Sequence, residues 1–357
     1  MLGNLVSLPG REINAETIRD ADALLVRSVT DINSELLKDS SISFVGTATS
    51  GIDHVDLDYL RQNRIHFAYA PGCNAQAVVQ YVFAVLAWLS EHDDFDWQNK
   101  TVGIIGGGKI GTLLATYLQS LGMEFVIYDP FLDESYEFAD KLVSLDVSLN
   151  QDVISLHCSL RKNDPHSSFH LLDANVLNQL SEGSILINAS RGSVIDNQAL
   201  KDFLTERQDV SCVLDVWENE PAIDASLLQE VRLGTSHIAG YSLEGKEQGS
   251  AQIYQAMLDC FAIDDAPAFP VNHRQSKLEI PLVDGVMHAV NRCILSSYNI
   301  NGDDDLLRQA TKDNSQLAVN FDGLRKNYSL RREFSHFKLM PGLSNEAYSI
   351  LKKLGFA

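Results

Sequence analysis

Three glycines at a fixed spacing carry the strongest chemical signal in this sequence. Gly106, Gly108 and Gly111 follow an apolar run and precede an amphipathic stretch, which is typical of a tight turn between a strand and a helix. In such a turn the first glycine permits the bend, the second lets a pyrophosphate approach the backbone, and the third lets the helix pack on the strand. The N–H groups at the helix start then face the phosphates. The residues predicted to bind a pyrophosphate are Gly106, Gly108, Lys109, Ile110 and Gly111.

An acidic residue follows the next apolar run. Asp129 lies 18 residues after Gly111, directly behind the run Phe125–Tyr128. A carboxylate at this place accepts hydrogen bonds from the ribose hydroxyls and repels a 2′-phosphate, so the sequence predicts NAD rather than NADP. An ordinary turn with a chance acid would contain the same residues, but strand, turn, helix and acid in this order favour a dinucleotide site.

Three polar residues stand behind later predicted strands. Arg191 follows Ile185–Asn188, Glu220 follows a strand expected at 213–216, and His237 comes 17 residues after Glu220. Ligands of open parallel sheets bind beyond the carboxyl ends of the strands, so we expect these side chains beside the nicotinamide. An imidazole can take a hydroxyl proton, a carboxylate can hold that imidazole, and a guanidinium can grip a carboxylate and a carbonyl oxygen. Each residue alone could be structural; together they predict oxidation of a 2-hydroxy acid.

The elements that must position these residues alternate along the chain. Alternation of strands and helices from residue 100 onward predicts an α/β fold with a doubly wound parallel sheet. The expected strands there are 102–105, 125–128, 153–156, 185–188 and 213–216, and the expected helices are 110–121, 173–179 and 197–205. Earlier strands are expected at 23–26, 44–47 and 65–69, with an edge strand possible at 2–8, and long helices at 75–90 and 243–261. No complete strand–helix unit precedes Arg11, so we expect the usual first unit of such a domain to be missing.

Composition limits the function classes. The chain has 357 residues, enough for two to three domains of about 150 residues, and 45% of them are hydrophobic, as in globular proteins. The net charge of -20 opposes binding to nucleic acid or anionic membranes but leaves a small anionic ligand possible. The longest apolar stretch, 77–89, is too short for a membrane span, and the first ten residues lack the basic start of a secretory signal.

Cysteines and histidines give no metal-site pattern. The five cysteines are widely spaced, which favours free thiols in a reducing cytoplasm. His166 and His170 are four residues apart, but Pro165 and the serines between them indicate a loop, so no metal site is expected. The acidic run 303–305 is expected to be a solvated turn.

The sequence resembles the D-isomer-specific 2-hydroxyacid dehydrogenases from Leu24 to Phe356. The general pattern of that family is matched by residues 106–111, 188–196, 215–221 and His237. Residues 26–30, 44–51, 70–75, 234–246, 324–328 and 331–333 resemble more narrowly the erythronate-4-phosphate dehydrogenases, a branch that serves pyridoxine (vitamin B6) biosynthesis. That branch carries an extra C-terminal dimerisation domain.

The resemblance implies an activity and a set of site residues. It implies an NAD-dependent oxidoreductase that converts 4-phospho-D-erythronate to 2-oxo-3-hydroxy-4-phosphobutanoate in the cytoplasm. Arg191, Glu220 and His237 become the catalytic residues, and Ser28, Thr49 and Tyr241 the substrate-binding residues. The implied cofactor-binding residues beyond the glycine turn are Asp129, Cys158, Ala189, Ser190, Asp215 and Gly240. For Ser28 and Thr49, routine turn chemistry is the alternative, and for Tyr241 it is a place in the core.

The same resemblance implies the domain organisation. A flavodoxin-like substrate domain is expected at 1–80 and 240–264, a Rossmann-type NAD-binding domain at 81–239, and an α+β dimerisation domain at 265–357, after the Pro-rich segment 264–270. The basic group Arg325, Lys326, Arg331 and Arg332 is expected to face a partner subunit in a homodimer. Alternatives are another phosphorylated 2-hydroxy acid dehydrogenase, such as one for 3-phosphoglycerate, or a non-catalytic NADH-sensing interaction protein.

Overall fold

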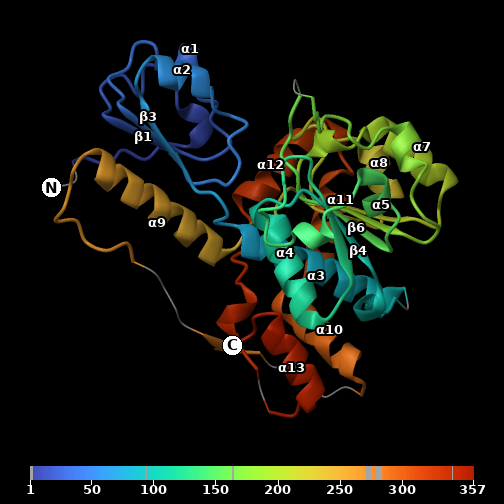
Figure 1. Ribbon diagram of the computed structural model, residues 1–357. Helices are drawn as coiled ribbons and strands as arrows, with labels where there is room; N and C mark the ends of the chain where they lie inside the picture. Colours follow the sequence, from blue (N-terminus) through green and yellow to red (C-terminus); the bar gives the residue numbers. More distant parts are fainter. Residues whose placement is uncertain (1–2, 94, 163–164, 271–274, 279–283, 340) are drawn as a thin grey trace. The chain divides into compact units, whose positions relative to one another are not determined.

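Two parallel sheets form the framework of the chain in the computed structural model (Figure 1). The structure describes residues 3–93, 95–162, 165–270, 275–278, 284–339 and 341–357. The chain divides into a smaller unit, Met1–Asn74 with Leu243–His273, and a larger unit, Ala75–Ser242 with Arg274–Ala357.

The larger unit contains a six-stranded sheet in the order β5-β4-β6-β7-β8-β9, with every pair parallel. Its strands are β4 (Val102–Ile105), β5 (Phe125–Tyr128), β6 (Val153–Leu156), β7 (Ile185–Asn188), β8 (Ser211–Leu214) and β9 (Leu233–Gly234). The first four have the predicted bounds. The strand expected at 213–216 begins and ends two residues earlier, because its ladder with β7 stops where Asn188 lies opposite Leu214.

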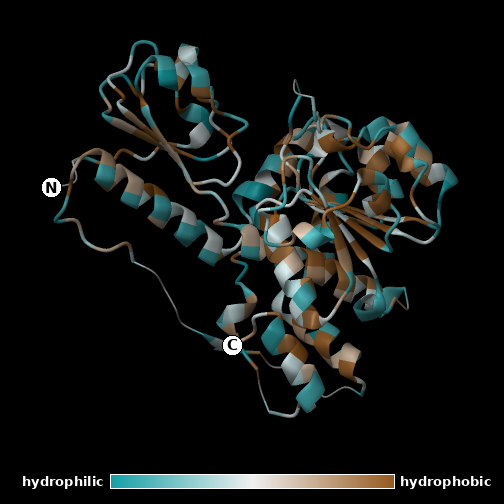
Figure 2. Cartoon of the chain, in the orientation of Figure 1, coloured by the Kyte–Doolittle hydropathy of each residue, from teal (hydrophilic) through white to brown (hydrophobic). Residues whose placement is uncertain are grey.

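Helices cover both faces of this sheet, as predicted for a doubly wound arrangement. Alternate strand residues point to opposite faces: Ile104 packs in a core cluster with α3 and α4, and Ile105 in a second cluster with α5 to α8. These helices are α3 (Ala75–His92), α4 (Lys109–Leu121), α5 (Leu145–Leu149), α6 (Ala174–Leu177), α7 (Asn197–Glu206) and α8 (Ala225–Glu230). The strands are brown in Figure 2 because residues buried on both sides are nearly all apolar.

The C-terminal segment folds onto the same unit. It comprises α10 (Val286–Ser297), α11 (Ile300–Ala310), α12 (Leu317–Lys326), α13 (Asn345–Lys353) and the parallel pair β10 (Ser276–Lys277) and β11 (Phe337–Lys338). Val290 of α10 and Leu351 of α13 share the core cluster of α3 and α4, whereas Phe321 of α12 lies in the other cluster. The segment is therefore α+β in content, while its role as a separate dimerisation domain stays a prediction.

Two expectations for this segment were wrong. The acidic run 303–305 lies inside α11, where Asp304 is buried and accepts hydrogen bonds from the Gly234 N–H (2.7 Å) and from Arg308 Nε (2.8 Å). Arg331 is buried rather than exposed to a partner, and its Nη2 donates to the carbonyl oxygens of Ala77 and Ala239. In both cases a charged side chain satisfies polar groups inside its own unit.

The smaller unit has a three-stranded parallel sheet, β1-β2-β3, with α1 and α2 on one side and α9 on the other. Its elements are β1 (Ala23–Val26), α1 (Ser34–Leu37), β2 (Phe44–Thr47), α2 (Leu57–Gln62), β3 (His66–Tyr69) and α9 (Leu243–Cys260). Residues 3–9 form no strand, so the possible edge strand at 2–8 is not found in its described part. The 3-10 helices of the chain are η1 (Gly10–Glu12), η2 (Trp97–Asn99), η3 (Ala139–Lys141), η4 (Gly192–Val194), η5 (Asn314–Gln316) and η6 (Phe334–His336).

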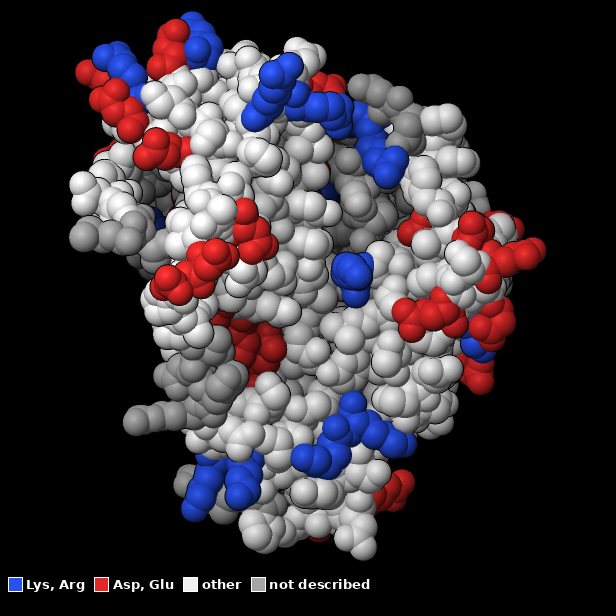
Figure 3. All heavy atoms as spheres, turned by 60° about the vertical axis from the view of Figure 1, so that its left-hand side comes forward, with Lys and Arg blue, Asp and Glu red and all other residues white. Residues whose placement is uncertain are grey.

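Charged side chains form small separate groups on the face drawn in Figure 3, with basic and acidic residues interspersed among neutral ones. Among the helices that the structure describes, none is long and apolar enough to span a membrane.

Candidate active site

The glycine turn has the geometry that its sequence predicts. Gly106 adopts φ +99°, and a Cβ there would lie 2.6 Å from the backbone nitrogen of Cys158. A Cβ at Gly111 would lie 2.0 Å from the carbonyl oxygen of Gly106, so the helix could not pack this closely with any larger residue. Gly108, by contrast, faces open space and begins α4 without a side-chain cap. The first N–H groups of α4 are thus available to a phosphate.

Asp129 holds this turn at the end of β5. Its Oδ2 accepts the Gly107 N–H at 2.9 Å and its Oδ1 accepts the Phe131 N–H at 3.0 Å. A pocket of about 210 Å³, partly open to solvent, lies here and is lined by Gly106, Gly108, Asp129, Phe131, Cys158 and Arg161, among others. An open helix start and a carboxylate beside a pocket are the features that bind a dinucleotide such as NAD.

Cys158 lines the same pocket but is not a nucleophile. Burial raises the pKa of its thiol to about 12, so the reactive thiolate is scarce at neutral pH. Its neighbour His157 is also buried, and burial lowers the pKa of that imidazole to about 3. Both side chains are neutral at pH 7 and line the pocket, and the cofactor-binding role of Cys158 stays a prediction.

Glu220 and His237 form a directly hydrogen-bonded pair. His237 Nδ1 lies 2.7 Å from Glu220 Oε2, and Glu220 Oε1 accepts the Trp217 N–H at 2.9 Å. Burial acts to raise the pKa of Glu220, but the charge and hydrogen bond of His237, the Trp217 N–H and the charge of Arg325 together lower it below its ordinary value of 4.5. Among the described residues, none contacts His237 Nε2 through a hydrogen bond or an ion pair. The carboxylate therefore stays ionised and orients an imidazole whose second nitrogen can exchange a proton with a ligand.

A buried carboxylate fixes the loop that carries His237. Asp215 is 1% exposed and accepts hydrogen bonds from the Thr235 hydroxyl (2.6 Å) and the Ile238 N–H (2.8 Å) through Oδ1, and from the Ala239 N–H (2.9 Å) through Oδ2. His237 itself adopts the left-handed φ of +57°, which costs about 1–2 kcal/mol for a residue with a side chain. The hydrogen bonds of Asp215, whose predicted role is cofactor binding, hold this strained backbone in place.

Arg191 lies behind β7, as predicted. Its Nη1 donates to the carbonyl of Ser190 at 2.8 Å, and its own carbonyl accepts from the Asn188 side-chain amide at 3.0 Å. The N–H and the hydroxyl of Ser190 donate to Asn188 Oδ1 at 3.0 and 2.8 Å, and Ala189 is buried between them. Asn188, which the sequence reading did not single out, thus organises the turn that carries Arg191, Ala189 and Ser190.

Tyr241 and Gly240 follow His237 on the same loop. The Tyr241 ring meets the Tyr328 ring edge-on, with centroids 5.8 Å apart, and the Arg325 guanidinium lies 6.0 Å from the Tyr241 centroid. The last turn of α12 therefore reaches the loop that carries His237. The sequence did not predict that Arg325 and Tyr328 lie against Tyr241, because Arg325 was expected at an interface between subunits.

Within the smaller unit, Ser28 lies exposed behind β1 and Thr49 lies two residues behind β2. The Thr49 hydroxyl donates to the Gly51 carbonyl at 2.8 Å and contacts the Thr47 hydroxyl at 2.9 Å. Burial and the nearby charge of Arg27 lower the pKa of Lys246, in the first turns of α9. Arg27 directly follows β1 and Lys246 stands on α9, and the predicted site residues include neither of these basic side chains.

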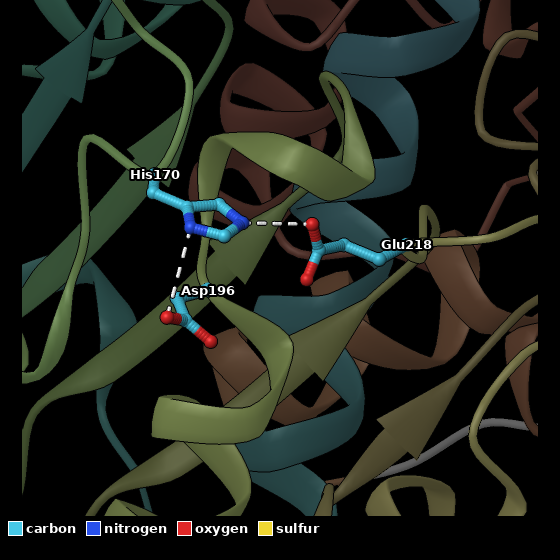
Figure 4. A group of neighbouring side chains, drawn as sticks. All are labelled: His170, Asp196 and Glu218. Carbon is cyan, nitrogen blue, oxygen red and sulfur yellow. Dashed lines mark hydrogen bonds and ion pairs between the residues drawn. The ribbon is translucent and has the colours of Figure 1, made fainter.

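His170, Asp196 and Glu218 form a second cluster, from the segments that follow β6, β7 and β8 (Figure 4). The imidazole lies between the two carboxylates: Nε2 is 2.8 Å from Glu218 Oε1 and Nδ1 is 3.6 Å from Asp196 Oδ2. The carboxylates are thus on opposite ring nitrogens, and one metal ion cannot bind all three groups unless the ring turns. Asp196 Oδ1 also caps α7 and Glu218 Oε2 accepts the Asn197 N–H, so the arrangement is explained by holding α7 to the loop of Glu220.

Comparison with known proteins decides the family. The chain is 42% identical to the erythronate-4-phosphate dehydrogenases of Salmonella arizonae and Escherichia coli K12, over 99% of this chain and 93% of theirs. The chain belongs to the erythronate-4-phosphate dehydrogenases. Residues 83–239 match the family model of the D-isomer specific 2-hydroxyacid dehydrogenase NAD binding domain, and residues 278–355 match a domain of unknown function, DUF3410.

Solved structures show the same fold. A crystal structure of D-lactate dehydrogenase from Aquifex aeolicus, complexed with NAD and lactic acid, superposes with a TM-score of 0.61 at 24% identity over 71% of this chain and 86% of that one. An NAD⁺-bound 3-phosphoglycerate dehydrogenase from Entamoeba histolytica gives 0.61 at 24% identity over 74% and 87%. The predicted family, the α/β class and the NAD cofactor are confirmed, and the chain is an NAD-dependent oxidoreductase of this family.

Proposed function

We propose that this chain oxidises 4-phospho-D-erythronate at its 2-hydroxyl carbon to 2-oxo-3-hydroxy-4-phosphobutanoate. The observation that carries the proposal is the 2.7 Å hydrogen bond between His237 Nδ1 and Glu220 Oε2, which leaves Nε2 to accept a proton. Relatives that are 42% identical over 99% of this chain are named erythronate-4-phosphate dehydrogenases, and this supports 4-phospho-D-erythronate as the substrate.

Three side chains divide the chemistry. His237 Nε2 takes the proton of the substrate hydroxyl, and Glu220 stabilises the imidazolium that results. Arg191 holds the carboxylate and the developing carbonyl oxygen with its planar fork. NAD, when bound, accepts the hydride from the same carbon, so the two electrons and the proton are both accounted for. The uncapped N–H groups of α4, together with Asp129, would hold that cofactor.

The smaller unit supplies further donors for the substrate. Ser28 and Thr49 carry hydroxyls behind two strands of its parallel sheet, and Lys246 is on the helix that packs against that sheet. These groups suit a carboxylate or a phosphate oxygen. We propose that they bind an anionic end of the substrate, in line with the predicted roles of Ser28 and Thr49.

The predicted organisation belongs to the same proposal. Residues 1–80 with 240–264 would be the flavodoxin-like substrate domain, 81–239 the Rossmann-type NAD-binding domain, and 265–357 the dimerisation domain of a homodimer. Two separate parallel sheets support the first two assignments. Five free cysteines support a reducing cytoplasm as the location.

A substrate panel tests the activity. NADH formation, followed at 340 nm, should be fastest with 4-phospho-D-erythronate and at least about tenfold slower, in kcat/KM, with D-erythronate, D-glycerate and 3-phosphoglycerate. A preference for 3-phosphoglycerate would assign the chain to that alternative substrate. NADH binding without turnover of any 2-hydroxy acid would contradict an enzymatic role.

A further inference from the structure

Arg325 stands in the last turn of α12, in the C-terminal segment, yet it faces the loop of the catalytic histidine. Leu317 and Phe321 of α12 are buried in the core cluster on one side of the six-stranded sheet, which fixes the helix. Beyond the helix, the Tyr328 ring packs edge-on against Tyr241, and the Tyr328 hydroxyl donates to Asp303 at 2.7 Å. The position of Arg325 is therefore set from both sides.

The guanidinium of Arg325 has no anionic partner in the part of the chain that the structure describes. Its Nε is buried without a hydrogen-bond partner, and no ion pair with a described residue is formed. Arg308 of the same segment differs, because it donates to Asp304 and to two carbonyl oxygens. Arg331 donates through Nη2 to the carbonyls of Ala77 and Ala239, while its Nη1 is buried without a hydrogen-bond partner among the described residues. A buried donor left unpaired costs about 1–3 kcal/mol, so this arrangement fits a group whose partner is a ligand.

The neighbours of Arg325 indicate which ligand. The guanidinium of Arg325 lies 6.0 Å from the ring centroid of Tyr241, four residues after His237. Its positive charge also lowers the pKa of Glu220, so Arg325 lies next to the proposed reaction site. Glu220 is already committed to His237 and to the Trp217 N–H, and cannot neutralise it. Arg191 is proposed to hold the carboxylate of the substrate, which leaves a second anionic group. A guanidinium matches phosphate oxygens through two parallel hydrogen bonds.

We propose that Arg325 binds the phosphate group of the substrate, so that the C-terminal segment supplies the preference for a phosphorylated 2-hydroxy acid. This assignment rests on the proposed function, and deepens it by naming the side chain that reads the phosphate. The helix that carries Arg325 is outside residues 83–239, which match the NAD-binding model.

The test compares two substrates in the full-length enzyme with NAD. Arg325→Gln should lower kcat/KM for 4-phospho-D-erythronate about 100-fold, mostly through KM, and leave that for unphosphorylated D-erythronate within about twofold. Arg325→Lys keeps the charge but not the fork, and should lose about tenfold. The matched control is Lys326→Gln, which removes a charge from the exposed next residue and should stay within about twofold of wild type for both substrates.

A binding measurement separates this proposal from the proposed function. Inorganic phosphate should bind the wild-type protein at least about tenfold more tightly than Arg325→Gln by calorimetry, with NADH affinity unchanged in both. This difference stands even if 4-phospho-D-erythronate is not the substrate. Equal losses of kcat/KM for phosphorylated and unphosphorylated acids would overturn the proposal, because Arg325 would then act through Glu220 and His237. Equal phosphate affinity in wild type and Arg325→Gln would overturn it as well.

Discussion

The residues of the site are distant in sequence, and short hydrogen bonds between their side chains and loops hold them together. Glu220 and His237 are 17 residues apart, and their pairing depends on Trp217 and Asp215, which hold the two loops. The chemical roles proposed for the pair lead to two predictions that concern individual side chains.

Replacement of His237 by alanine removes the proposed general base. We expect kcat to fall about 10²–10⁴-fold, the usual contribution of general acid–base catalysis, while NADH still binds because the glycine turn is untouched. Stopped-flow and fluorescence titration measure the two quantities. His66→Ala, at an exposed histidine of β3, is the control and should keep wild-type kcat. A His237→Ala enzyme with wild-type kcat would show that another group takes the proton.

The lowered pKa of Glu220 makes a pH-dependent contribution to stability. A carboxyl whose pKa is lower in the folded than in the unfolded protein stabilises the fold fully above its ordinary value of 4.5, and this contribution is lost as pH falls through the lowered folded value. The free energy of unfolding of wild type minus that of Glu220→Gln should therefore shrink between pH 6 and pH 3, an interval chosen as roughly spanning the titration of a carboxyl. Urea titrations at several pH values measure it; a difference that grows on acidification would contradict the assignment.

At the scale of elements, β5 and the glycine turn are joined by Asp129. Its replacement by alanine removes the group that repels a 2′-phosphate and the acceptor of the Gly107 N–H. The ratio of kcat/KM for NAD to that for NADP should drop by about tenfold, equivalent to about 1.4 kcal/mol. Asp133→Ala, four residues further along in an exposed turn, should leave the ratio unchanged. Equal use of NAD and NADP by the wild type would refute the role of Asp129.

A second element contact joins α11 to β9. Asp304 accepts the Gly234 N–H and pairs with Arg308, which in turn donates to the carbonyls of Leu228 and Val231. Asp304→Ala leaves a partly buried guanidinium and a strand N–H without their acceptor, so the free energy of unfolding should fall by about 3 kcal/mol. Asp305→Ala, at an exposed position of the same helix turn, should change it by less than about 0.5 kcal/mol. Denaturant unfolding of both variants makes the comparison, and similar values would contradict a specific role for Asp304.

The same elements show how far the sequence could lead. Buried parallel strands are continuous apolar runs, so β1, β2, β4, β5, β6 and β7 have the bounds that hydrophobicity alone predicted. The burial and the partners of charged side chains are harder to predict, because they depend on residues far away in the chain. Asp304 meets Gly234 across 70 residues and Arg331 meets Ala77 across 254, and no local pattern signals such contacts.

At the scale of the whole molecule, the C-terminal segment is part of the larger unit. Val290, Ile294 and Leu351 are buried in one cluster with α3 and α4. Removal of residues 270–357 would expose this apolar surface and leave the N–H of Gly234 without its acceptor Asp304. The truncated chain should therefore aggregate, so the proposed dimer is better tested in the full-length protein by a surface substitution.

The proposed dimer predicts that an exposed apolar residue of the C-terminal segment is covered by a second copy. Val319 on α12 is 68% exposed, and Leu330 of the same segment is also exposed, so this segment presents two large apolar side chains to solvent in the single chain. Light scattering should give twice the chain mass of 39.5 kDa for the wild type at micromolar concentration, and Val319→Asp should shift the population to monomer. Val147→Asp provides the control, because Val147 is also exposed (42%) but lies on α5, outside the C-terminal segment, and this variant should stay dimeric. A wild-type monomer would contradict the dimer, and dissociation by Val147→Asp alone would place the contact on a different surface.

Since Arg325 lies on the same helix as Val319, the monomeric variant should also be assayed with 4-phospho-D-erythronate. An unchanged KM would indicate that one chain by itself holds the phosphate.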